Sequence, residues 1–215
     1  MRSIVVLISG SGTNLQAIMD YIATEKLDAN IELVLSNRPN AYGLQRAAEA
    51  SIKTAVIDHK AFDSRESFDQ EMIKVIDPYK PDLIVLAGFM RILSTDFVEH
   101  YEGRMINIHP ALLPAYKGLH THQRALADGV SHHGASVHYV TPELDSGTVI
   151  AQGRVPVMDD DTEERLQERV HHIEHIVYPE VVKWFSEGRL TYQNHQAYMD
   201  GELLETPVII DQESA

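Results

Sequence analysis

The sequence predicts an α/β fold: a single-domain, Rossmann-like arrangement in which a mostly parallel, twisted sheet carries helices on both faces. The first observation behind this prediction is a nearly continuous apolar run at residues 3–9, typical of a strand buried on both faces of a parallel sheet. The second is the glycine-containing turn that follows directly, with apolar residues at helical spacing after it. The third is that strand-like and helix-like segments keep alternating through the first half of the chain.

In the first half, the helix after the glycine turn is expected to bury apolar residues from Leu15 onward. Asp63 and Glu66 form a capping-box pattern, which predicts that a later helix opens at Asp63 and runs through Asp77. Ser94 is expected to cap a short helix that ends at His100. The remaining expected elements are strands at residues 31–36, 53–57 and 82–87 and a helix at residues 43–50.

In the second half, residues 105–109 form the next expected strand, which Pro110 ends because proline cannot donate to a ladder. A helix from Thr121 to Asp128 is expected to stop at Gly129. Asp161 with Glu164 predicts the start of a long C-terminal helix that ends near Gly188. The other expected elements are strands at residues 135–141 and 149–157 and a hairpin around Gly201.

Length and composition limit the function. With 215 residues, 44% of them hydrophobic, we expect one domain over residues 1–210, and a disordered acidic tail over residues 211–215. The absence of cysteine excludes thiol nucleophiles and thiolate metal sites. The formal net charge of −14 argues against nucleic acid or an anionic membrane as the main partner. We therefore expect small-molecule partners, and either a monomer or a homodimer. The N-terminal apolar run is too short for a membrane span and leads into a glycine turn, so we expect a strand rather than a signal peptide, and a cytoplasmic protein.

The glycine turn, residues 9–14, joins a strand to a helix. Such a turn gathers backbone N–H groups at a helix N-terminus and suits a phosphate, although a Gly-x-Gly is often only a tight turn. A dinucleotide site is weakly supported, because Leu15 replaces the third glycine and no carboxylate follows the second strand. A Walker-type site is excluded because no Gly-Lys-Ser/Thr follows.

The loop of residues 88–93 follows a central strand and carries Phe, Met, Ile and Leu around Arg91. Ligands of open α/β sheets bind at the carboxyl ends of the strands, so this loop suits a flat, apolar ligand. A loop that only packs the core explains the same residues. Arg65 lies in the first turn of its predicted helix, where a cation is unfavourable for the helix dipole, so it is either a ligand contact or a solvated arginine.

Asn107 and His109 lie two positions apart in a strand and should present an amide and an imidazole on one face. The alternative is an edge strand whose polar residues face water. The turn Asp145-Ser146-Gly147 either serves only as a turn or delivers a carboxylate to the end of the strand that bears His109.

Several histidines resemble metal ligands only superficially. Residues 171–175, His-His-Ile-Glu-His, differ from the H-E-x-x-H helix because the glutamate is misplaced. The pairs at 120/122 and 132/133 lack a carboxylate at ligand spacing. We expect no metal site. Glu174 could equally well face the amine of a substrate as belong to a metal site. His138 alternates with apolar residues and is expected to be structural.

Five segments together resemble the phosphoribosylglycinamide formyltransferases, the folate-dependent glycinamide ribonucleotide transformylases of purine synthesis. These segments are ISGSGTNLQAI, VLAGFMRILS, INIHPALLPAYKGLHTH, TPELDSG, and HHIEH followed by YP. The H-P-x-L-L-P block is shared by several folate enzymes that transfer or hydrolyse formyl groups. The first loop and the chain length make the resemblance specific.

The resemblance implies transfer of a formyl group from 10-formyltetrahydrofolate, as cosubstrate, to the amine of glycinamide ribonucleotide. The implied catalytic trio is Asn107, His109 and Asp145. The implied ribonucleotide contacts are Gly12, Thr13, Asn14, His171, His172, Ile173 and Glu174. The implied folate contacts are Arg65, Met90, Arg91, Ile92, Leu93, Asn107, Thr141, Pro142, Glu143, Leu144 and Asp145.

These residue types suit that chemistry. Attack of a neutral amine on the formyl carbon gives a tetrahedral species with a negative oxygen, which Asn107 and a protonated His109 can stabilise by donating hydrogen bonds. The Asp145 carboxylate would favour the imidazolium form of His109. The proton lost by the amine must reach the folate nitrogen, through His109, Asp145 or a water. Neither a metal nor a covalent nucleophile is required.

Three alternatives remain. A formyltetrahydrofolate hydrolase would use the same trio to deliver water, but related hydrolases carry an extra N-terminal domain. A methionyl-tRNA formyltransferase would need an RNA-binding domain and a basic surface. A catalytically silent nucleotide- or folate-binding module would keep the fold without turnover, which the intact trio argues against.

Overall fold

The computed structural model describes residues 1–25 and 27–211. The packing of the chain divides it into two compact units. Unit 1 comprises Met1–Asn107 and Val140–Pro142, and unit 2 comprises Ile108–Tyr139 and Glu143–Ala215. The expectation of one domain over residues 1–210 stays a prediction.

Unit 1 contains a parallel sheet, which confirms the predicted strand type. Its strands are β1 (Arg2–Ile8), β2 (Ala29–Ser36), β3 (Thr54–Val56), β4 (Leu83–Leu86) and β5 (Met105–His109, of which 105–107 belong to unit 1). The strands pair in the order β5-β4-β1-β2-β3. The chain therefore adds β2 and β3 on one side of β1, and then β4 and β5 on the other side. In open α/β sheets, ligands commonly bind where the strand order reverses in this way, at the carboxyl ends of the two strands, which here are β1 and β4.

Helices cover both faces of the unit 1 sheet, as predicted. On one face, α3 (Arg65–Ile76) and α4 (Thr95–His100) bury Phe68, Met72 and Phe97 against Val5 and Leu35 in one apolar cluster. On the other face lie α1 (Thr13–Glu25) and α2 (Tyr42–Glu49), which both contact β2. Two short 3-10 turns, His59–Ala61 and Asp77–Tyr79, flank α3. Ser94 caps α4, as predicted, because its side chain accepts the Phe97 N–H.

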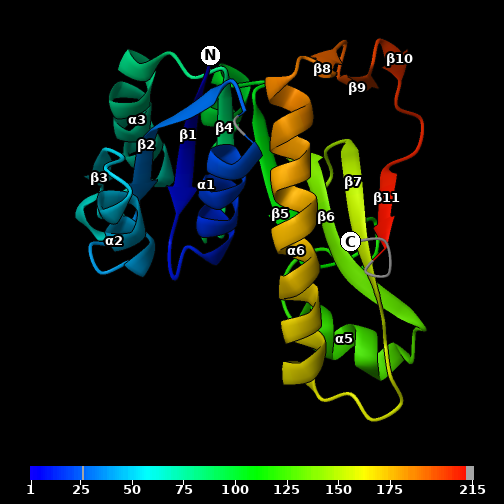
Figure 1. Cartoon of the computed structure of the whole chain (residues 1–215). Helices are drawn as coiled ribbons and strands as arrows, with labels where there is room; N and C mark the ends of the chain where they lie inside the picture. Colours follow the sequence, from blue (N-terminus) through cyan, green and yellow to red (C-terminus); the bar gives the residue numbers. More distant parts are fainter. Residues whose placement is uncertain (26, 212–215) are drawn as a thin grey trace. The chain divides into compact units, whose positions relative to one another are not determined.

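Unit 2 is built around the antiparallel pair β6 (His132–Tyr139) and β7 (Val149–Pro156), with β11 (Val208–Asp211) parallel to β7. The long helix α6 (Glu163–Ser186) packs along β6 and β7, and Figure 1 shows it running alongside them. The shorter α5 (Thr121–Asp128) ends at Gly129, as predicted, with φ of 62°. The predicted hairpin around Gly201 is confirmed, since β8 (Leu190–Gln193), β9 (Gln196–Met199) and β10 (Glu202–Leu203) form an antiparallel sheet.

Gly134 allows β6 and β7 to approach closely. A Cβ atom at Gly134 would lie 1.9 Å from the carbonyl oxygen of Gly153. We expect Gly134→Ala to lower the free energy of unfolding by about 3 kcal/mol, the upper end for overpacking, because backbone must move. Urea unfolding measures the change. Gly10→Ala is the matched control, since a Cβ there meets no atom within 4 Å. Equal stability of the two variants would contradict the prediction.

Two predicted helix starts were wrong by one residue. Ser64, rather than Asp63, caps α3, because its hydroxyl accepts the Ser67 N–H at 3.1 Å and Ser67 reciprocates. Thr162, rather than Asp161, caps α6 by accepting the Arg165 N–H. A serine or threonine directly after each aspartate supplies the same cap one position later.

The predicted acidic tail does not begin at Asp211. This residue ends β11, and its carboxylate forms a two-pronged ion pair with Arg154, at 2.8 and 2.9 Å. Residues 212–215 lie outside the described residues, so the rest of that prediction stays untested.

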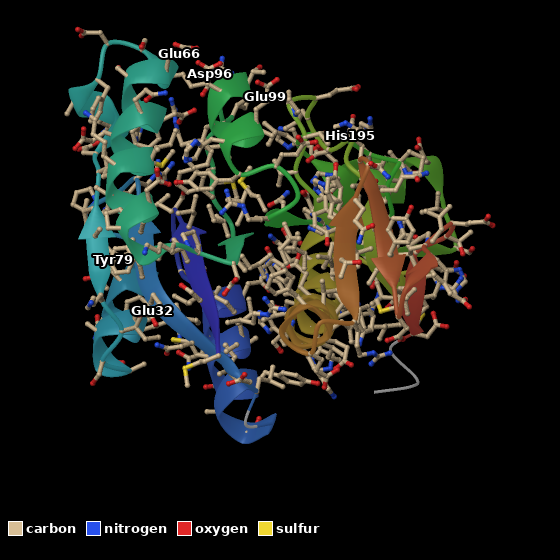
Figure 2. All side chains as sticks on the ribbon, turned by 90° about the horizontal axis from the view of Figure 1, so that it is seen from above. Glu32, Glu66, Tyr79, Asp96, Glu99 and His195 are labelled. Atoms are coloured by element: carbon tan, nitrogen blue, oxygen red, sulfur yellow. The ribbon has the colours of Figure 1, made fainter. Side chains whose placement is uncertain are left out.

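One shallow, open hollow lies in unit 1 near the amino ends of its strands, and Figure 2 labels two of its residues, Glu32 and Tyr79. None of the predicted site residues lines it. Ligands of open α/β sheets bind at the opposite, carboxyl end, so this hollow is not the expected site. None of the helices within residues 1–25 and 27–211 is long and apolar enough to span a membrane.

Candidate functional site

The glycine turn after β1 leads directly into α1, as the sequence predicts. Gly12 has φ of 71° and lies so close to α2 that a Cβ atom would approach the Gly43 Cα to 2.6 Å. The Gly43 N–H donates to the carbonyl of Gly10 at 3.0 Å, which fixes the turn against α2. Thr13 and Asn14 open α1. The turn therefore presents a helix N-terminus at the end of β1, where an anion is favoured.

Arg46 of α2 adds a cation to this turn, which sequence analysis missed. Its Nε–H donates to the carbonyl of Ser11 at 2.9 Å, and its guanidinium lies over the ring of Tyr42. The only sequence signal was that Arg46 lies three residues after Gly43, on the same face of the helix. This signal is weak, because a lone arginine on an amphipathic helix is normally solvated.

The loop after β4 has features of both interpretations left open by the sequence, a loop that packs the core and a loop that could bind an apolar ligand. Phe89 and Leu93 are buried in the core cluster, with 9% and 8% of their surface exposed. Met90 and Ile92 point outward, 66% and 57% exposed, with Arg91 between them. Half of the loop therefore packs the core and half presents apolar side chains at the carboxyl end of a central strand.

Other predicted contacts also fall in unit 1. Asn107 is half-buried on β5 and lies opposite Leu86 of β4 in the register. Thr141 and Pro142 belong to a segment whose Val140 N–H donates to the carbonyl of Met105 at 2.9 Å. Arg65 lies in the first turn of α3, as predicted, and it is exposed, which is compatible with a ligand contact and with a solvated arginine.

Unit 2 brings His109 and Asp145 together. The Nδ1 of His109 lies 3.6 Å from the Oδ2 of Asp145, and both side chains are more than nine-tenths buried. The Nε2 of His109 lies 2.9 Å from the carbonyl oxygen of Tyr116. Because a carbonyl can only accept, Nε2 carries a proton, and the imidazolium form offers a second proton toward the carboxylate. An oxygen atom of an acceptor group therefore lies beside each ring nitrogen of His109.

Asp145 is held in place by its backbone and by a neighbouring loop. It has φ of 49°, in the left-handed region, and its Oδ2 accepts the Gly118 N–H at 2.9 Å. Next to it, the Lys117 ammonium donates to the hydroxyl of Ser146 and lies 3.9 Å from Glu143. The 143–146 turn is therefore tied to the segment that ends at Gly118.

His138 also approaches Asp145, which sequence analysis did not foresee. Its Nε2 lies 3.9 Å from Oδ1 of Asp145, while Nδ1 donates to the carbonyl of Tyr139 at 2.9 Å. Burial lowers the pKa of His138 below its ordinary value. Alternation with apolar residues predicted a buried histidine but could not show which loop it faces. The carboxylate of Asp145 therefore lies between two imidazoles.

On α6, His171 and His172 are exposed, whereas Ile173 and Glu174 are buried. Ile173 packs against Gly153 of β7, where a Cβ atom would come within 2.5 Å of it. Glu174 is 5% exposed, unusual for a carboxylate. In the described part of the chain, no group of three or more His, Cys, Asp or Glu side chains is placed to hold a metal ion.

Two other buried histidines of unit 2 make its stability depend on pH. Burial, followed by repulsion from neighbouring histidines, lowers the pKa of His122 and of His133 to about 4 from 6.5. The unfolded chain binds protons at these sites below about pH 6.5, whereas the folded chain does so only near pH 4. The free energy of unfolding should therefore fall as pH drops through this window, by on the order of 3 kcal/mol per histidine.

Urea unfolding between pH 4 and 7.5 measures this dependence. His133→Gln should flatten the curve, because one depressed pKa is removed. His172→Gln is the control, since His172 is exposed on α6. A His133→Gln curve as steep as that of the parent would refute the assignment.

The predicted trio is divided between the units: Asn107 belongs to unit 1, and His109 and Asp145 belong to unit 2. The structure thus brings two of the three together and places the third two positions from His109 on β5. The role of the trio stays a prediction. The same holds for the predicted ribonucleotide and folate contacts, which are distributed over both units.

Comparisons with known proteins identify the family. The formyl transferase family model matches residues 2–182. A phosphoribosylglycinamide formyltransferase of Escherichia coli is 54% identical over 202 residues, which cover 94% of this chain and 95% of the relative. The Haemophilus influenzae protein of that name is 44% identical and is covered to 96%. A solved structure of that enzyme from Coxiella burnetii is 55% identical, with a TM-score of 0.93 and coverage of 97% of this chain and 99% of that one. The chain therefore belongs to the formyl transferase family and, within it, to the phosphoribosylglycinamide formyltransferases.

Proposed function

We propose that this protein transfers the formyl group of 10-formyltetrahydrofolate to the amine of glycinamide ribonucleotide. The products are formylglycinamide ribonucleotide and tetrahydrofolate, in de novo purine biosynthesis. The observation that carries the proposal is the buried pair of His109 and Asp145, on a protein whose relatives bear the name of this activity. A buried imidazole beside a carboxylate is the arrangement that acid–base and oxyanion chemistry require.

The first step is attack of the neutral amine nitrogen on the formyl carbon. The carbon–oxygen double bond opens, so negative charge develops on the formyl oxygen. We assign the stabilisation of this oxygen to the Nδ2–H of Asn107 and the Nε2–H of His109. In this structure that Nε2–H donates to the carbonyl of Tyr116, and it is the ring proton that does not face Asp145.

The second step breaks the bond between the formyl carbon and the folate nitrogen. The carbon–oxygen double bond forms again, and the leaving nitrogen takes up a proton equivalent to the one the amine has lost. His109 suits this transfer because its imidazolium can give a proton and later accept one. Asp145 stabilises the ring of His109 while the ring is positively charged, and it does not itself need to become protonated.

The substrate phosphate is assigned to Gly12, Thr13 and Asn14. Support comes from the N-terminus of α1 and from the guanidinium of Arg46, which is tied to this turn. The glycinamide amine is assigned to the α6 segment of residues 171–174. There the buried carboxylate of Glu174 could accept a hydrogen bond from the neutral amine.

The folate is assigned to the outward half of the loop after β4 and to the turn that ends at Asp145. Met90 and Ile92 offer exposed apolar surface for a flat ring system. Arg91 and Arg65 supply cations for the carboxylates of the glutamate tail. The segment of residues 141–145 would bring Asp145 to the reacting end.

One assay separates transfer from its rivals. The protein is mixed with 10-formyltetrahydrofolate, and loss of the formyl group is followed with and without glycinamide ribonucleotide. Loss that requires the amine supports the proposal. Loss without the amine indicates a hydrolase, and no loss in either case indicates a silent binding module.

A further inference from the structure

Two buried polar side chains fix the ends of the loop after β4, here called the 88–94 loop. Met90 and Ile92 project from its middle into solvent. Apolar side chains gain nothing by pointing into water, so some interaction must hold the backbone that presents them. The interactions come from Ser9 and Asp69, which belong to none of the predicted contacts.

The first anchor is Ser9, at the end of β1. Its N–H donates to the carbonyl of Gly88 at 3.2 Å, and its Oγ accepts the Met90 N–H at 2.8 Å. The hydroxyl proton of Ser9 is donated to Oδ1 of Asn37 at 2.6 Å, so the lone pairs of Oγ are directed to the loop. Ser9 is 3% exposed and Asn37 is fully buried. This anchor is therefore a short chain of hydrogen bonds shielded from water.

The second anchor is Asp69 on α3. Its Oδ2 accepts the Ser94 N–H at 2.6 Å, and only 1% of its surface is exposed. Burial of a carboxylate is costly unless its hydrogen bonds compensate. The bond goes to the last residue of the loop, which also begins α4. The anchor thus sets both the loop end and the helix start.

We propose that Ser9 and Asp69 are positioning residues of the formyl-donor site, because they hold the backbone from which Met90, Arg91 and Ile92 extend. The inference rests on the proposed function. Both anchors bind backbone N–H groups, one at each end of the exposed stretch. Their loss should therefore change how the loop meets the donor more than it changes the chemical step.

The expected result for Ser9→Ala is a rise of about 5- to 30-fold in the KM for 10-formyltetrahydrofolate. The Met90 N–H and Asn37 Oδ1 each lose a buried partner, so the loop leaves its binding geometry part of the time. The kcat and the KM for glycinamide ribonucleotide should stay within about twofold of the parent values. A purely structural role would lower the amount of active protein and leave the KM unchanged.

Asp69 is tested with two variants. Asp69→Ala removes the acceptor of the Ser94 N–H and should raise the donor KM in the same way. Asp69→Asn keeps an acceptor oxygen of the same shape and should restore a donor KM near that of the parent. Equal donor KM values for the Ala and Asn variants would overturn the assignment of Asp69.

Ser3→Ala is the matched control, since Ser3 lies at the other end of β1 and donates to the carbonyl of Tyr79 at 3.1 Å. Amide hydrogen exchange gives a second readout that needs no turnover. Exchange at Met90 should become faster in Ser9→Ala but not in Ser3→Ala, and exchange at Ser94 should become faster in Asp69→Ala. A parent protein in which these two amides exchange freely would overturn the inference even if every variant failed to fold.

The parent protein separates the two proposals. If it transfers no formyl group to the amine, the proposed function and the inference fail together. If it does transfer, but Ser9→Ala changes kcat alone or leaves the donor KM at the Ser3→Ala value, the inference fails and the proposed function stands.

Discussion

Asp145→Asn should lower kcat by about 10⁴-fold, the size known for the same change beside a catalytic histidine in serine proteases. The amide cannot stabilise the positive ring of His109, and its N–H₂ group favours a neutral ring that accepts at Nδ1. The fold should persist, because an amide oxygen still accepts the Gly118 N–H and asparagine tolerates the left-handed backbone. Steady-state kinetics measures the loss, and circular dichroism checks the fold.

Asp211→Asn controls for this change. It removes a carboxylate from an arginine pair on β11, far along the chain from the site residues, and should leave kcat unchanged. Near-normal turnover of the Asp145 variant would refute its assignment as the partner of the imidazolium.

Asn107→Ala should lower kcat by about 10²–10³, the usual cost of one lost oxyanion donor. We expect the effect in kcat because the negative charge on the formyl oxygen develops only when the amine attacks and is absent from the bound substrates. Stopped-flow or steady-state kinetics with both substrates saturating measures it. Asn30→Ala, on the exposed part of β2, is the control. A change confined to the KM for folate would make Asn107 a binding residue instead.

Local sequence patterns predicted the bounds of an element well where a single residue ends that element. The strand at Met105–His109 and the helix at Thr121–Asp128 have the predicted bounds, because Pro110 and Gly129 end them. The starts of α3 and α6 were wrong because adjacent Asp-Ser and Asp-Thr pairs offer two possible caps. A short sequence pattern does not say which of two neighbouring caps the chain uses.

Long-range contacts were the part that residue patterns could not predict. Ser9 and Met90 are 81 positions apart, and Asp69 and Ser94 are 25 apart, so no spacing rule connects them. Arg46 and His138 were likewise missed because their partners lie on other elements. The residue pattern left the pairing of His109 with Asp145 as one of two interpretations of the turn, the resemblance favoured it, and the structure supplies its distance.

The left-handed backbone at Asp145 has a consequence for which sequences can occupy this position. Glycine, asparagine and aspartate adopt such a conformation at low cost, whereas longer or branched residues are strained. Glutamate would keep the negative charge but would be strained in the left-handed conformation. Glycine would adopt this conformation without strain but would lack the charge. Aspartate alone meets both demands, so a directed-evolution library at position 145 should return the parent residue, even from selections that reward only weak activity.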